Sequence, residues 1–347
     1  MRYHQLGDSN ISVSEICLGS MTWGTQNDFS DARAQIDMAI KHGVNFIDTA
    51  ELYPTTPLSA ATQGETESIL GRYMAEQKCR QDLIVATKIG GSGVAHLRNG
   101  SKITPKGINE ALDQSLGRLQ TDYIDLYQLH WPNRGHYHFR KSWTYKPRVV
   151  DRSSHDQEIS DILGALKENV EKGKIRTIGL SNETAWGTAS FLRIATSENL
   201  PRVASIQNEY SLVCRWFDLD LAELSINEKV GLLAYSPLAA GILTGKYLGG
   251  KVPEKSRASI KPGLDGRLTE HVEPAVANYV ALANSLQMQP EQLALAFCLS
   301  RPFMTSVIIG ATTEDQLESA LYSAEIKLDS ASLESIQNIY RQYPAPM

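Results

Sequence analysis

The chain has 347 residues, of which 42% are hydrophobic and 21% charged, and its formal net charge is -5 at pH 7. This balance excludes a disordered chain, and the scattered basic residues exclude the basic surface of a nucleic-acid-binding protein. The N-terminal segment lacks an apolar signal core, no apolar stretch is long enough to span a membrane, and the four cysteines are far apart. We therefore expect a cytoplasmic protein that acts on a small molecule.

Eight short apolar runs alternate with amphipathic segments along the chain. The runs are typical of strands buried on both faces and cover residues 15–18, 45–47, 83–86, 123–128, 174–178, 203–206, 231–234 and 306–309. The segments between them have helical periodicity and cover residues 31–42, 65–76, 105–119, 158–172, 184–197, 218–228 and 313–325. This order predicts an α/β fold, a closed (β/α)8 TIM barrel forming a single domain over residues 1–347, with a doubly wound open sheet as the alternative.

Some segments fall outside the eight units. Residues 3–6 and 11–13 are separated by the turn residues 7–10, which predicts an N-terminal β-hairpin that could plug one end of the barrel. We expect long loops after the fourth and seventh strands, at residues 131–156 and 239–268, and a C-terminal helix at residues 331–341. Loops of this length are usually functional or disordered.

Four polar residues follow predicted strands at the end where such a barrel places its functional groups. Asp48 and Tyr53 follow the second strand, Lys88 ends the third and His130 ends the fourth. Each alone has an ordinary structural role, but together they can transfer a proton. A cation such as Lys88 favours the phenolate of Tyr53, and Asp48 can hold that cation in place. His130 can donate a hydrogen bond to a carbonyl oxygen.

Three motifs resemble those of the aldo-keto reductase superfamily. They are residues 43–50 with Tyr53, residues 129–132 and residues 172–182, and the resemblance extends over essentially the whole chain. Bacterial Tas-like members are the most similar in appearance, because they share the Tyr53-Pro54 loop and the ending at residues 343–346. The resemblance implies a (β/α)8 barrel that binds extended NADPH. It also implies that the four polar residues are a catalytic tetrad, with Tyr53 as the proton donor in carbonyl reduction.

No common nucleotide-binding fingerprint is present. Residues 91–96 break the GxGxxG pattern, and residues 241–247 lack the spacing and the hydroxyl residue of a P-loop. The resemblance instead implies cofactor contacts at Met21, Ser181, Asn182, Gln207, Tyr235, Ser236, Pro237, Leu238, Gly241, Lys246, Arg257, Gly310, Ala311, Thr312 and Gln316. The preference for NADP over NAD depends mainly on Arg257. Ser319 and Ala320 depart from the family's usual adenine contacts.

The loop at residues 131–156 is expected to form one wall of the substrate pocket, with Trp131 and the earlier Trp23 in contact with a carbonyl substrate. The histidines in this loop, His136, His138 and His155, have no carboxylate or cysteine partner at a convincing spacing, so we predict no metal site. The sequence identifies neither the carbonyl compound nor the oligomeric state.

Two alternatives stay open. The first is a cofactor-binding regulatory subunit with little turnover, similar to the potassium-channel β subunits, but those carry asparagine at the position of His130. The second is an alcohol dehydrogenase that works in the oxidative direction with the same tetrad, since sequence does not set the direction.

Overall fold

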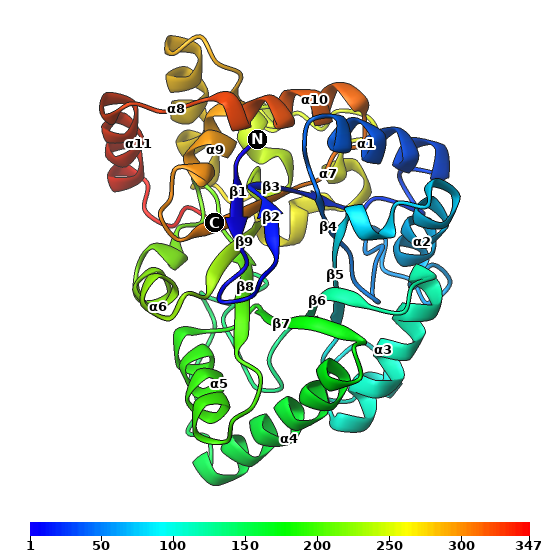
Figure 1. The fold of residues 1–347 in the computed structure, drawn as a ribbon. Coiled ribbons are helices and arrows are strands. Elements are labelled where there is room, and N and C mark those ends of the chain that lie inside the picture. The colour runs from blue at the N-terminus through cyan, green and yellow to red at the C-terminus, as the bar shows by residue number, and fades with distance from the viewer.

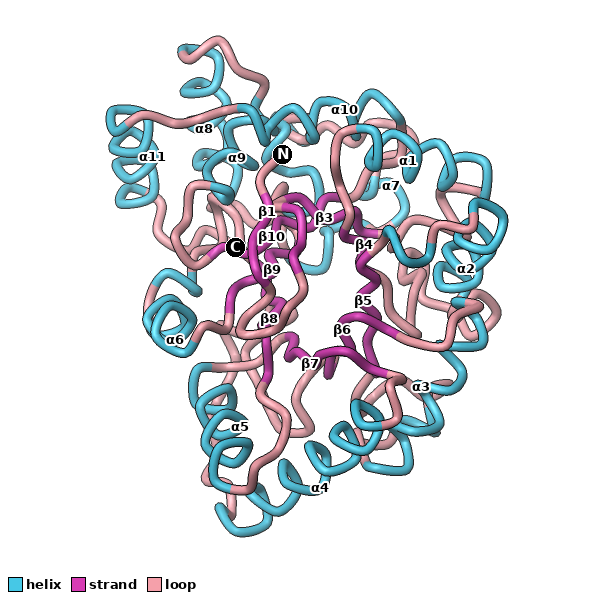
Figure 2. Tube along the Cα trace, in the orientation of Figure 1, coloured by secondary structure: helices cyan, strands magenta, loops and turns pink.

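The computed structural model describes all 347 residues and shows a closed barrel of eight parallel strands in the order β10-β3-β4-β5-β6-β7-β8-β9. Figure 2 shows the ring of strands with the helices outside it. The eight predicted strands are confirmed, with bounds that differ by a few residues: β3 (Ile16–Gly19), β4 (Phe46–Asp48), β5 (Ile84–Ile89), β6 (Ile124–Leu129), β7 (Ile175–Ser181), β8 (Val203–Glu209), β9 (Gly231–Tyr235) and β10 (Met304–Ile309).

The helices cover the outer face of this barrel (Figure 1). All seven predicted helices between strands are present: α1 (Phe29–Lys41), α2 (Glu65–Gln77), α3 (Pro105–Leu119), α4 (Arg152–Glu171), α5 (Ala185–Ser197), α6 (Asp220–Glu228) and α10 (Glu314–Tyr322). Local sequence explains some starts, because the Thr104 side chain accepts a hydrogen bond from the Gly107 amide and Pro105 occupies the first turn of α3. The C-terminal helix is confirmed as α11 (Ser330–Gln342). None of the helices is long and apolar enough to cross a lipid bilayer.

The loop after β9 contains short 3-10 turns and the one-turn helix α7 (Arg257–Ile260). Two longer helices follow that the sequence did not predict, α8 (Val272–Ser285) and α9 (Pro290–Leu299). α8 buries only one face, at Val272, Ala275, Val276, Tyr279 and Ala283, whereas α9 is buried over most of its length. A helix that is apolar nearly all round lacks the amphipathic periodicity that identifies surface helices.

The predicted N-terminal hairpin consists of β1 (Tyr3–Gln5) and β2 (Ser12–Ser14), which pair antiparallel. Leu6, Ile11 and Val13 of this hairpin are buried against the apolar residues of the barrel interior, including Phe46 and Leu233. The hairpin therefore closes the end of the barrel at which the strands begin. It leaves the opposite end, where the strands finish, open to ligands.

Candidate active site

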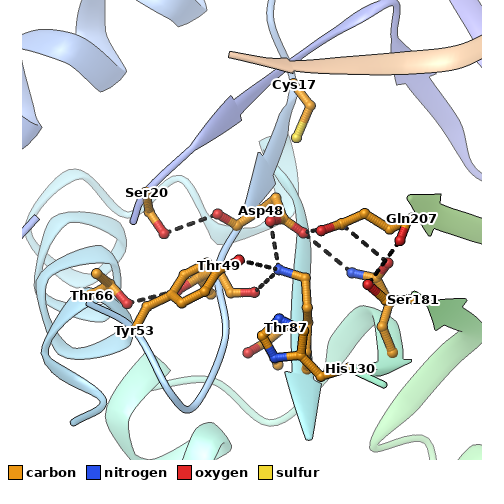
Figure 3. Close-up of polar contacts among 12 residues, drawn as sticks. Cys17, Ser20, Asp48, Thr49, Tyr53, Thr66, Thr87, His130, Ser181 and Gln207 are labelled. Atoms are coloured by element: carbon orange, nitrogen blue, oxygen red, sulfur yellow. Dashed lines mark hydrogen bonds and ion pairs between the residues drawn. The ribbon is translucent and has the colours of Figure 1, made fainter. Parts of the chain in front are cut away.

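The predicted tetrad meets at the open end of the barrel. The Lys88 ammonium lies 2.6 Å from an Asp48 carboxylate oxygen and 2.8 Å from the Thr49 carbonyl oxygen, and it donates to the Tyr53 hydroxyl oxygen at 3.3 Å. Lys88 is fully buried. Parallel strands bring these groups together because β4 and β5 finish at the same edge, and Tyr53 returns toward them from the loop after β4 (Figure 3).

The second carboxylate oxygen of Asp48 also has hydrogen-bond partners. It accepts hydrogen bonds from the side-chain amides of Gln207 at 2.8 Å and Gln128 at 3.2 Å. Figure 3 shows Gln207 reaching toward Asp48 from the far side of the barrel. Gln128 was not among the sequence-based candidates, although it occupies a strand end just before His130. Two amides and one ammonium therefore fix the carboxylate that holds Lys88.

Burial changes the proton affinity of the tetrad. Burial raises the pKa of Tyr53 above its usual value, and the Lys88 ammonium, which favours the phenolate, offsets this only in part. Burial alone would lower the pKa of Lys88, but the Asp48 carboxylate and the Tyr53 hydroxyl raise it, so the ammonium stays charged. Lys88 therefore acts on Tyr53 in the expected direction, although desolvation sets the net direction of the Tyr53 pKa shift.

His130 lies beside Tyr53, with ring centroids 5.8 Å apart in an edge-on arrangement. Burial, and then the Lys88 charge, lowers the pKa of His130 well below its usual value, so the imidazole is neutral at pH 7. Its Nδ1 atom is buried without a hydrogen-bond partner, and its backbone carbonyl accepts a hydrogen bond from the Asn182 amide at 2.9 Å. A neutral imidazole held in this way can donate one hydrogen bond to a carbonyl oxygen.

A single large cleft of about 1730 Å³ opens above the tetrad. Asp48, Tyr53 and His130 line it, while Lys88 lies beneath them. The structure brings every predicted cofactor position to this cleft: Met21, Ser181, Asn182, Gln207, Tyr235, Ser236, Pro237, Leu238, Gly241, Lys246, Arg257, Gly310, Ala311, Thr312 and Gln316.

Some of these polar groups are already paired with one another. The Tyr235 hydroxyl donates to the Asn182 side-chain oxygen at 2.7 Å, and the Ser181 hydroxyl donates to the Gln207 carbonyl at 2.9 Å. At the far end of the cleft the Gln316 side-chain oxygen accepts from the Thr312 amide. These bonds pre-position the side chains around a planar polar ligand.

Two cations on the loop after β9 are without ion-pair partners. The Arg257 guanidinium lies in the cleft, and burial together with the nearby Arg267 lowers its pKa. The adjacent Ser256 hydroxyl is buried and has no hydrogen-bond partner. A Cβ at Gly241 would lie 2.9 Å from the Lys246 Nζ atom, so glycine allows this ammonium close to the chain. Cations with spare donors at a cleft suit phosphate groups.

The two predicted substrate contacts have different places in the structure. Trp131 lines the cleft and packs beside His130, with ring centroids 4.9 Å apart. Trp23 does not reach the cleft, since it is fully buried and its indole donates to Gln35 of α1 at 2.8 Å. The turn after β3 directs the indole into the core between the barrel and α1. Met21 and Thr22, two residues of the same loop, line the cleft instead.

Comparison with known proteins agrees with this geometry. The model of the aldo/keto reductase family matches residues 15–341. This chain belongs to the aldo/keto reductase family. The protein tas of Escherichia coli is 43% identical, with both chains covered completely. The uncharacterized oxidoreductase YrpG of Bacillus subtilis is 30% identical over 98% of this chain and 96% of its own.

A third relative is named for a different role. A probable voltage-gated potassium channel subunit beta of Arabidopsis thaliana is 31% identical over 99% of this chain and 98% of its own. Aldo/keto reductases are oxidoreductases that generally use nicotinamide cofactors, so the family shows oxidoreductase chemistry for this chain.

Proposed function

We propose that this chain reduces aldehydes or ketones to alcohols with NADPH, acting as a single cytoplasmic domain with Tyr53 as the proton donor. The observation that carries the proposal is the contact of Tyr53 with the buried Lys88, and of Lys88 with the buried Asp48, at the floor of a large cleft. Such a chain of contacts holds a phenol, a poor acid in water, where a carbonyl oxygen can receive its proton.

The cleft also fits the proposed cofactor. Arg257 is a half-buried guanidinium without an ion pair, beside the buried and unpartnered Ser256 hydroxyl, and this combination favours the 2'-phosphate that distinguishes NADPH from NADH. Lys246 beside Gly241 suits the pyrophosphate, and Asn182 with Tyr235 suits the nicotinamide end. NADPH would supply the hydride that adds to the carbonyl carbon.

The chain's own residues then have separate tasks. Tyr53 gives its hydroxyl proton to the carbonyl oxygen, and the neighbouring Lys88 ammonium stabilises the phenolate that forms. Neutral His130 donates a hydrogen bond to the same oxygen as negative charge develops there. Asp48 keeps Lys88 in place.

A regulatory role with little turnover is the competing proposal, since one relative is a probable channel subunit. The intact tetrad, including His130, favours an enzyme, because a purely regulatory protein has no need of a buried proton donor. Oxidation of an alcohol would use the same residues in reverse, with the Tyr53 phenolate as the base.

The test is a panel of aldehydes and ketones with NADPH, in which the loss of nicotinamide absorbance is measured, with NADH in parallel. We expect turnover by the wild type and a loss of roughly 100-fold to 10,000-fold in kcat for Tyr53→Phe. Equal activity in Tyr53→Phe would contradict the mechanism. Binding of NADPH without turnover of any carbonyl would favour the regulatory role.

A further inference from the structure

The loop after β6 forms one wall of the cleft, and its charged residues are all basic. Residues 131–150 contain five lysines and arginines and no aspartate or glutamate, although the whole chain has a net charge of -5. All five line the cleft, and we call them the basic wall: Arg134, Arg140, Lys141, Lys146 and Arg148. A cleft lined by one sign of charge concentrates ligands of the opposite sign.

Histidines add no charge to this wall. Burial, followed by neighbouring cations, lowers the pKa of His136 to about 4, and burial lowers that of His138 to about 3. Lys141, Lys146 and Arg148 are exposed and form no ion pair within the chain. Three of the five cations are therefore free to attract an anion.

Two buried carboxylates anchor the loop. Glu183, just after β7, pairs with Arg134, which also donates to the Thr184 hydroxyl at 2.9 Å. Glu209, the last residue of β8, accepts from the Arg140 Nη2 atom at 2.5 Å. The wall thus has a defined position over the cleft before any substrate arrives.

Arg140 differs from Arg134 in having spare donors. Both Glu209 oxygens are already bound by Arg267, from the loop after β9, at 3.0 Å each. Two guanidinium groups therefore share one carboxylate. The Nε and Nη1 atoms of Arg140 are buried without a partner, and only 8% of its side chain is exposed. Unpaired buried donors are costly, so this guanidinium is prepared for a further acceptor.

The loop that carries the basic wall begins next to His130. The Trp131 ring packs beside His130, and the Phe139 ring packs edge-on against Trp131 with centroids 6.1 Å apart. Arg140 follows Phe139 directly. These ring contacts join His130 to the segment of the loop that bears Arg140. The cations assigned to the cofactor, Lys246 and Arg257, come from a different loop, the one after β9.

We propose that the carbonyl substrate carries a carboxylate and that the basic wall binds this group, with Arg140 as its principal partner. This inference rests on the proposed function. A guanidinium binds a planar carboxylate through two parallel hydrogen bonds, either from its Nε and Nη2 atoms or from its two Nη atoms. Arg140 turns toward the cleft to do so, and Glu209 keeps Arg267 as its partner. Trp131 and Phe139 contact the apolar part of the substrate.

Matched substrates test this directly. The 3- and 4-carboxybenzaldehydes and their methyl esters differ only in charge and in one methyl group. We expect kcat/KM with NADPH to be roughly tenfold or more higher for an acid than for its ester at low salt, and this ratio to fall as salt screens the wall. The same assay with 4-formylphenyl phosphate distinguishes a carboxylate site from a general anion site.

Substitutions show which residues cause the preference for the acid over the ester. We expect Arg140→Gln to lower kcat/KM for the acid by roughly tenfold to a hundredfold, and much more than for the ester. The double substitution Lys141→Gln with Lys146→Gln should lower kcat/KM for the acid less, because water screens the attraction between these exposed side chains and the substrate. Lys106→Gln on α3 is the matched control, because Lys106 is exposed, pairs only with Glu110 and lies outside the cleft.

A binding measurement separates this site from catalysis. In the NADP complex, 4-carbamoylbenzoate, which has no reducible aldehyde, should bind more weakly to Arg140→Gln than to the wild type by calorimetry. Equal kcat/KM for acid and ester, equal losses for both in Arg140→Gln, or a weakened NADPH affinity would overturn the inference while leaving carbonyl reduction intact. A preference for the phosphate would overturn the carboxylate assignment. No turnover of any carbonyl would overturn the proposed function itself.

Discussion

The two ends of the barrel are built from the same strands and differ completely in chemistry. On three neighbouring strands an apolar residue faces inward, and a polar one follows two positions later: Phe46 and Asp48, Ala86 and Lys88, Leu126 and Gln128. Side chains two positions apart on a strand point the same way. On each of these strands, two residues therefore separate the apolar layer from the polar floor of the site.

The end of the barrel closed by the hairpin shields the polar residues at the open end from water. Leu6, Ile11 and Val13 of the hairpin cover the apolar layer and keep water from reaching the tetrad from below. Figure 3 shows the apolar Cys17 on the side of Asp48 away from Tyr53. Charges in such surroundings interact more strongly than in water. The hairpin and the tetrad therefore support one site from opposite ends of the barrel.

The largest effect is expected from Lys88→Met at the polar end. This change leaves the Asp48 carboxylate buried with only the amides of Gln128 and Gln207 as partners. Removing one member of a buried ion pair costs about 3–5 kcal/mol of unfolding free energy, and carbonyl reduction should be lost as well. Chemical denaturation and NADPH oxidation measure the two losses.

The double variant Asp48→Asn with Lys88→Met is its control. Because no charge is left unpaired, most of the stability should return, whereas activity should not. A double variant as unstable as Lys88→Met would show that the lost stability comes from packing and not from the buried charge.

The apolar end is tested by Gly7→Ala in the hairpin turn. Gly7 has a φ of +58°, and a Cβ there would lie 2.5 Å from the Ala204 carbonyl oxygen. Gly249→Ala is the matched control, since Gly249 has a φ of +70° and no atom near its Cβ position. We expect Gly7→Ala to cost about 1–3 kcal/mol more than the control in chemical denaturation. Equal losses would mean that the turn does not press against the barrel.

A smaller effect is expected at the cleft from Arg257→Ala. Removing this guanidinium should weaken NADPH binding by about tenfold and leave NADH binding unchanged, because only NADPH carries the 2'-phosphate. Cofactor titration by fluorescence measures both constants. A parallel loss for both cofactors would place Arg257 elsewhere along the dinucleotide.

The smallest effect expected is that of pH. The pKa of His130 is lowered well below its usual value and that of Tyr53 is raised, so neither group changes charge near neutrality. His130 stays neutral as the pH falls to about 6, and Tyr53 keeps its proton as the pH rises to about 9, so kcat/KM should be flat over this range. A steep limb inside it would show that the NADPH complex has different pKa values.

The strands and the tetrad could be predicted because their signals are local. Short apolar runs mark the buried strands, and Asp48, Lys88 and His130 stand at strand ends. The role proposed for Tyr53 needed the family motif, since a loop tyrosine has no periodicity of its own. The balance of burial against the Lys88 charge could not be read from the sequence, because it depends on how fully the site is enclosed.

Other features depend on long-range contacts. Gln128 became part of the site through its bond to Asp48, 80 residues earlier. Trp23 was placed near the substrate from its position after a strand, but its partner Gln35 on α1 holds it in the core. The sharing of Glu209 by Arg140 and Arg267 joins two loops that the sequence predicted only to be long.

The central claim is that the open end of the barrel delivers a hydride from NADPH and a proton from Tyr53 to one carbonyl group. NADPH deuterated at both C4 positions tests it, with mass spectrometry of the alcohol formed from a substrate of the panel. We expect the wild type to place one deuterium on the carbinol carbon and Tyr53→Phe to form almost no alcohol. Alcohol without deuterium, or equal yields from both proteins, would contradict the account.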